Sequence, residues 1–178
     1  MSGNIVGRGF ILEHPGKIVK TIESSVGIGF PYLPDEELLP LPGAFKAVWD
    51  TGAEDSMIKD ETAKTLGLSQ IGERYVCGVG GTFLSKVYLA SLFFPNDTVE
   101  PSIKLLSCDN DLREDILIGM DIISQGDFLI NNFAGETLFS FQVPSTMKMT
   151  LYQINELYES YKSLPPLLPP SGDSKANP

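Results

Sequence analysis

The residue best placed to do chemistry is Asp50, which ends the apolar run 45–49 and is followed directly by Thr51 and Gly52. A carboxylate at the end of a buried strand is costly unless a partner stabilises its charge. Gly52 lets the backbone turn where a side chain would clash. The same three residue types are ordinary turn formers, so an Asx-type turn without a function is the competing interpretation.

The single histidine restricts the other chemistries that hydrolases use. His14 lies beside Pro15 and Gly16, far along the chain from any serine or cysteine in a nucleophile-like context. A Ser-His-Asp or Cys-His mechanism would require it to fold back onto a distant site, and a histidine-based zinc site has one candidate ligand. We interpret His14 as a surface turn residue and expect any catalysis to use carboxylates, without a metal or a cofactor.

Charge and composition restrict the partners. The net charge of −10 repels polyanions, so we expect no nucleic acid partner. We also expect no signal peptide and no membrane span, because no apolar run has the required length. Two cysteines, Cys77 and Cys108, allow at most one disulfide, and free thiols in the cytoplasm are the simpler interpretation.

Short β-branched segments separated by glycine and proline predict a mostly-β domain. Residues 1–16 look irregular, and the four prolines of 31–43 predict a loop or an extended arm. A helix of about two turns is expected after Met57-Ile58, with Asp60 as its cap. Within the segment 144–162, a C-terminal helix is predicted over 149–162, and the proline-rich tail 163–178 is predicted to be disordered.

Three segments in order carry a more specific pattern. The first is Asp50-Thr51-Gly52-Ala53 after an apolar strand, continued by Glu54-Asp55; the second is Gly78-Val79-Gly80-Gly81 at a hairpin tip; the third is Ile116-Leu117-Ile118-Gly119 followed by Met120-Asp121-Ile122-Ile123. They resemble the catalytic loop, the flap tip and the hydrophobic-hydrophobic-glycine element of the retropepsins. These are the single-domain, homodimeric aspartic proteases of retroviruses and some cellular proteins. The run 63–68 is more similar to the cellular and bacterial branch than to the viral one.

The resemblance implies a single-lobe acid-protease fold over 17–143, with its core in 45–143. This would be a closed β-barrel with one short helix after the Ile-Gly element. It also implies an aspartic endopeptidase that hydrolyses an extended peptide or protein substrate. Because the chain holds one Asp-Thr-Gly, the second catalytic aspartate would come from an identical subunit. Asp50, Thr51 and Gly52 would form the catalytic loop, and substrate would contact Ala53, Glu54, Asp55, Gly78, Val79, Gly80, Gly81 and Ile118.

One position departs from the viral pattern. Viral members usually carry an arginine directly after the second glycine, where it pairs with an acidic residue near the catalytic loop. This chain has Met120 there, so Glu54 lacks that partner. We take this departure as a sign of the cellular branch.

Several alternatives accompany these predictions. The same fold could act as a non-catalytic dimeric peptide-binding module, or as a precursor whose groove is occupied by 29–43 or 149–178. Cys77 beside the hairpin tip could act as a redox handle, although a small buried hydrophobe is the favoured interpretation. A solvated turn is favoured over a cation site for Asp109, Asp111 and Asp115.

Overall fold

A computed structural model describes residues 8–33, 39–78, 81–95, 97–108 and 112–146, and the single residues 148, 150, 152, 153, 156 and 159. The chain divides into two units, Met1–Thr146 and Met147–Pro178. No helix among the described residues is long and apolar enough to cross a membrane.

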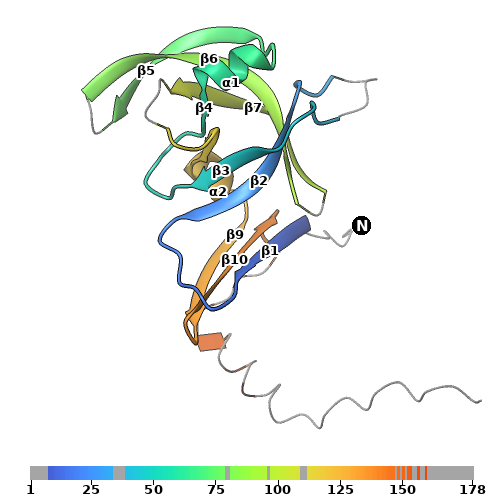
Figure 1. Ribbon diagram of the computed structural model, residues 1–178, viewed down its shortest axis with the longest axis vertical. Coiled ribbons are helices and arrows are strands. Elements are labelled where there is room, and N and C mark those ends of the chain that lie inside the picture. Colours follow the sequence, from blue (N-terminus) through green and yellow to red (C-terminus); the bar gives the residue numbers. More distant parts are fainter. Residues whose placement is uncertain are drawn as a thin grey trace, which may run out of the picture. The chain divides into compact units, whose positions relative to one another are not determined.

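Strands dominate the first unit, as the sequence predicts (Figure 1). The described elements, in chain order, are β1 (Arg8–His14), β2 (Ile22–Gly29), β3 (Phe45–Trp49), β4 (Met57–Lys59), α1 (Asp60–Thr65), β5 (Gln70–Gly78), β6 (Gly81–Phe94), β7 (Thr98–Cys108), β8 (Ile116–Ile118), α2 (Met120–Ile123), β9 (Asp127–Phe133) and β10 (Glu136–Val143). The short helix predicted after the Ile-Gly element is α2.

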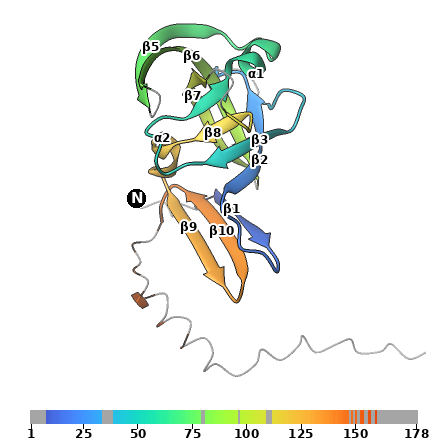
Figure 2. The same cartoon turned by 60° about the vertical axis from the view of Figure 1, so that its left-hand side comes forward.

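The larger sheet has seven strands in the order β2-β3-β8-β4-β7-β6-β5. Its long strand β6 pairs with β5 through its first half and with β7 through its second half. Near its end β6 also pairs with β2, through Gly27 opposite Phe93. The sheet therefore curls back on itself (Figure 2); the closed barrel that the resemblance implies stays a prediction.

The smaller sheet has the order β1-β10-β9 and corrects one expectation. Residues 1–16 were predicted to be irregular, but 8–14 form β1, antiparallel to β10 with Phe10 opposite Phe141. In the sequence, the alternation of apolar and other residues that would indicate this strand is short. It is limited to Phe10 and Leu12, with Gly9 before them and the Pro15-Gly16 turn after them. The strand forms because β10, from the far end of the unit, supplies its hydrogen-bond partners.

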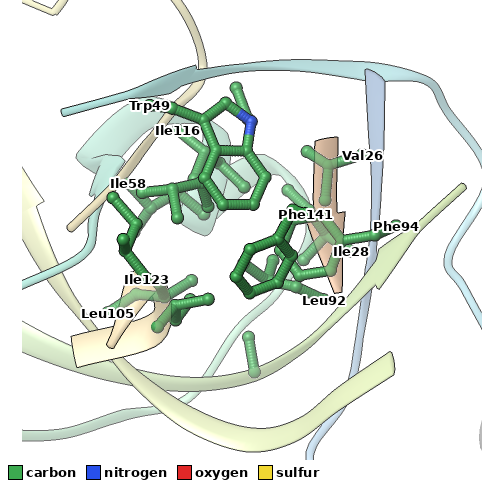
Figure 3. Packing of buried hydrophobic residues seen from close by; sticks show 14 of the residues in the cluster. Val26, Ile28, Trp49, Ile58, Leu92, Phe94, Leu105, Ile116, Ile123 and Phe141 are labelled. Carbon is green, nitrogen blue, oxygen red and sulfur yellow. The ribbon is translucent and has the colours of Figure 1, made fainter. Parts of the chain in front are cut away.

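An aromatic core joins the two sheets around Trp49, the last residue of β3 (Figure 3). Its ring centroid lies 4.9 Å from that of Phe141 and 5.1 Å from that of Phe139, both on β10. Its indole Nε1 donates to Ser24 Oγ at 2.9 Å, so the one polar atom of the buried ring is satisfied. The residue before Asp50 is therefore firmly anchored.

The helix predicted after Met57-Ile58 is α1, but Asp60 does not cap it. Lys59 occupies the cap position without a side-chain cap bond, and Asp60 is the first helical residue, buried against β6. Of the C-terminal helix predicted within 144–162, most residues lie outside the described part, as does all of 163–178. At its predicted start, Thr150 and Gln153 exchange side-chain-to-backbone hydrogen bonds of 2.8 and 3.3 Å, the pattern of a capping box.

Candidate active site

Asp50 begins a tight loop at the end of β3. Its backbone N–H donates to the carbonyl of Ile118 at 2.9 Å, which extends the parallel pairing of β3 with β8 by one residue. Its carboxylate oxygen Oδ1 accepts a hydrogen bond from Gly52 N–H at 2.8 Å. The loop is thus an Asx-type turn, and that turn fixes the direction of the carboxylate. Asp50 is half-buried and Thr51 is exposed in the single chain.

Backbone hydrogen bonds tie the loop to the start of α2. The N–H of Met120 donates to the carbonyl of Ala53 at 2.8 Å, and the N–H of Asp121 donates to the carbonyl of Glu54 at 3.0 Å. Because these donors belong to the first turn of a helix, they have no partner within the helix itself. Residue 120 therefore braces the loop through its main chain, although its side chain is not an arginine.

Ser56 completes this connection, and sequence reasoning missed it. Its hydroxyl donates to Asp121 Oδ1 at 2.6 Å and accepts from Gly119 N–H at 3.0 Å. A methyl group on Gly119 would lie 2.6 Å from the carbonyl carbon of Asp55, closer than real contacts allow. The glycine of the Ile-Gly element is therefore required by the close passage of the candidate catalytic loop. Ile118, predicted to contact substrate, is fully buried in the hydrophobic core.

The predicted glycine-tipped hairpin is formed by β5 and β6, which pair as far as Gly78 opposite Gly81. Val79 and Gly80, at the predicted tip, lie outside the described residues. Gly81 has a φ of +107°, which an L side chain would adopt only with strain. Cys77 is exposed, which corrects the expectation of a small buried hydrophobe; β5 is the edge strand of the sheet, so little covers its side chains.

Two further contacts were not predicted from the sequence. Arg74 of β5 donates a hydrogen bond to Asp55 and forms an ion pair with it; no local signal connects residues so far apart in sequence. Asp115 accepts a hydrogen bond from Lys46 N–H at 3.0 Å, which holds the strand before the candidate loop. Asp109 and Asp111, named with it as a possible cation site, lie outside the described residues.

Comparisons with known proteins agree with this arrangement. An aspartyl protease family model matches residues 43–122, which contain the loop, the hairpin and the Ile-Gly element. The crystal structure of a retropepsin-like aspartic protease from Rickettsia conorii superposes with a TM-score of 0.50 at 14% identity, over 78% of this chain and 96% of that chain. No curated protein matches the sequence.

Two other solved structures align less well. The solution structure of Simian Foamy Virus (mac) protease has a TM-score of 0.40 at 14% identity, over 58% of this chain and 92% of that chain. The retroviral protease-like domain of Ddi1 from Leishmania major has a TM-score of 0.43 at 17% identity, over 64% and 83%. The family match and the Rickettsia structure confirm the predicted resemblance: the fold is retropepsin-like, and residues 43–122 match the aspartyl protease family model.

Proposed function

We propose that the protein is an aspartic endopeptidase whose active form is a homodimer, with one Asp50 from each subunit. The observation that carries the proposal is the Asp50-Thr51-Gly52 turn, held by backbone bonds to residues 118–121 inside the segment that matches the aspartyl protease family. A loop fixed on both sides can hold a carboxylate in a reactive position.

The chemistry follows from two carboxylates brought close together. They cannot both ionise, so they share one proton and bind one water between them. One carboxylate takes a proton from the water as the oxygen of that water attacks the peptide carbonyl. The other carboxyl group donates its proton to the developing oxyanion. Collapse of the tetrahedral intermediate breaks the C–N bond, and the amine leaves with a proton from the pair. Thr51 would hydrogen-bond across the dimer, and Gly52 would allow substrate to approach the backbone.

The substrate would bind as an extended strand between the candidate catalytic loop and the β5–β6 hairpin. On the loop side, Ala53, Glu54 and Asp55 are the proposed contacts. On the hairpin side the proposed contacts are Gly78, Val79, Gly80 and Gly81. The hairpin would exclude water over the reacting bond, which strengthens the electrostatic interactions beneath it.

Two features support a second copy as the partner. Only one Asp-Thr-Gly occurs in the sequence. In addition, β9 is an edge strand that exposes Leu129, Ile130 and Phe133, the last at 74% of its surface. An exposed apolar edge strand of this kind promotes aggregation unless another strand covers it. A cytoplasmic location remains a prediction from the sequence.

The test is Asp50→Asn. We expect peptidase activity, followed by mass spectrometry of peptides incubated at mildly acidic pH, to fall by at least about a thousandfold. The melting temperature should stay within about 3 °C, because the amide can still accept the Gly52 hydrogen bond. Glu61→Gln, which removes an exposed carboxylate from α1, is the matched control.

The same assay separates the alternatives. Cleavage that a statine-type inhibitor blocks supports the endopeptidase. A chain that binds peptides and leaves them intact favours the binding module, and activity that begins only after removal of part of the chain favours the precursor. Turnover that survives Asp50→Asn removes Asp50 from catalysis.

A further inference from the structure

The side chain of Asp55, in the candidate catalytic loop, contacts a different element from those that the backbone of the loop contacts. The backbone of the loop is hydrogen-bonded to Ile118, the last residue of β8, and to residues 120 and 121, the first two of α2. The carboxylate of Asp55 instead accepts a hydrogen bond from the guanidinium of Arg74, with which it forms an ion pair. Arg74 lies on β5, the first strand of the hairpin.

The position of β5 makes this contact informative. β5 is the last strand of the seven-stranded sheet and pairs with β6 alone. Its residues are exposed along nearly the whole strand, so it has no buried side chain to anchor it. A hairpin arm of this kind opens locally at low cost. Side-chain contacts with neighbouring elements therefore have a large share in fixing where the arm lies.

The other charged groups around this contact are already engaged or exposed. The charged residues that border a cavity of about 630 Å³ here are Asp55, Glu73, Arg74, Lys104 and Asp121, and Glu73 is exposed. Asp121 accepts hydrogen bonds from Ser56 and from the N–H of Ile122. Lys104 is exposed and has no partner among the described contacts. Arg74 is thus the cation that neutralises the Asp55 carboxylate.

The exposure of the pair indicates what it does. The side chains of Arg74 and Asp55 are 51% and 30% exposed. Ion pairs this accessible contribute little to the free energy of folding, and salt screens them. Stabilisation of the fold is therefore a poor explanation of this ion pair. Holding the weakly anchored strand β5 in position requires little energy, and an exposed ion pair can supply it.

We propose that Arg74 is a positioning residue that holds the β5–β6 hairpin against the candidate catalytic loop of its own subunit. From β5, Arg74 supplies the positive charge that pairs with Asp55 of the loop. Met120, at the position where viral members usually carry an arginine, has no charge. The kinetic consequence rests on the proposed peptidase function: the groove between hairpin and loop would widen when the pair is broken, and substrate would bind more weakly.

Hydrogen exchange tests the contact without reference to activity. In Arg74→Ala we expect the amides of 70–78 and 50–56 to exchange about three to ten times faster than in the parent, and the parent at high salt to shift in the same direction. Arg74→Lys should keep most of the protection, because it keeps the charge. Lys104→Ala, which removes a cation from the same cavity, should change neither segment. The double variant Asp55→Arg with Arg74→Asp should restore protection. Equal exchange in the parent and Arg74→Ala would overturn the proposal.

Kinetics test the consequence, with any peptide that the Asp50-dependent assay identifies as a substrate. Arg74→Ala should raise KM about three- to tenfold and leave kcat within about twofold, since the contact acts on binding. The melting temperature should fall by less than about 3 °C. An unchanged KM would overturn the positioning role. A parent without peptidase activity would contradict the proposed function, and the exchange experiment would still decide the role of Arg74.

Discussion

At the scale of single residues, the geometry of the candidate site depends on small groups that fit where larger ones would not. Gly119 allows the backbone of Asp55 to pass at contact distance, and Ser56 joins Gly119 to Asp121. These residues do not touch the reacting atoms in the proposed mechanism. They determine instead where the chain on either side of Asp50 can lie.

Gly119→Ala should therefore damage both stability and activity. The added methyl group would meet the backbone of Asp55 at 2.6 Å, so the loop or α2 must move. We expect a loss of about 1–3 kcal/mol in the free energy of unfolding and a large loss of peptidase activity, measured by denaturant unfolding and by the peptide assay. Gly72→Ala is the matched control, since nothing lies within 4 Å of the position of its Cβ. A Gly119→Ala protein with the stability of the parent would show that the loop can accommodate the added methyl group.

At the scale of elements, a buried carboxylate joins α1 to the base of the hairpin. Asp60 accepts hydrogen bonds from Lys86 Nζ at 2.8 and 2.9 Å and from the Tyr88 hydroxyl at 2.6 Å, both on β6. Lys64, one helical turn away, adds an ion pair at 2.5 Å. The hydrogen bonds from Lys64, Lys86 and Tyr88 hold the pKa of Asp60 well below its usual range.

Asp60→Asn should destabilise the protein in a pH-dependent way. Because the pKa is lower in the folded state, the ionised carboxylate stabilises the fold above the ordinary aspartate pKa of about 3.9, and the contribution is lost as pH falls below it. We expect the variant to lose about 2–4 kcal/mol near pH 7 and to approach the parent as the pH falls towards 2. Urea unfolding from pH 7 down to 2 measures this, and a difference that is constant with pH would contradict it.

These elements also show how much of the structure could be predicted from the sequence. The candidate catalytic loop, the glycine-tipped hairpin and α2 were predictable because glycine, proline and apolar runs act on their immediate neighbours. The strand β1 was missed, Asp60 was taken for a cap, and Cys77 was taken to be buried. Each depends on a partner far along the chain or on which strand ends the sheet, and local patterns do not record either. The ion pair of Arg74 with Asp55 was missed for the same reason.

At the scale of the whole molecule, the proposed site is incomplete in one chain. Thr51 is exposed, and the smaller sheet ends in the apolar edge of β9. A two-fold axis that brings two copies of Asp50 together would account for both the exposure and the single Asp-Thr-Gly. The dimer is therefore the part of the proposal with the sharpest test.

Mixing subunits provides that test. If parent and Asp50→Asn chains are combined in equal amounts and allowed to exchange, half of the parent chains pair with an inactive partner. Peptidase activity should then fall to about half of that of the same amount of parent alone. Glu61→Gln chains should cause no such loss. Activity that is unaffected by the Asp50→Asn chains, together with sedimentation as a monomer, would show that each chain works alone.

The position of Trp49 has a practical consequence. It is the only tryptophan in the sequence and directly precedes Asp50. The residue is 6% exposed, and its ring packs among aromatic residues of both sheets. Intrinsic fluorescence excited selectively at tryptophan therefore comes from a single place, one residue from the candidate catalytic carboxylate. Each variant described above carries its own optical reporter, with no label attached, of whether the chain beside Asp50 is still folded.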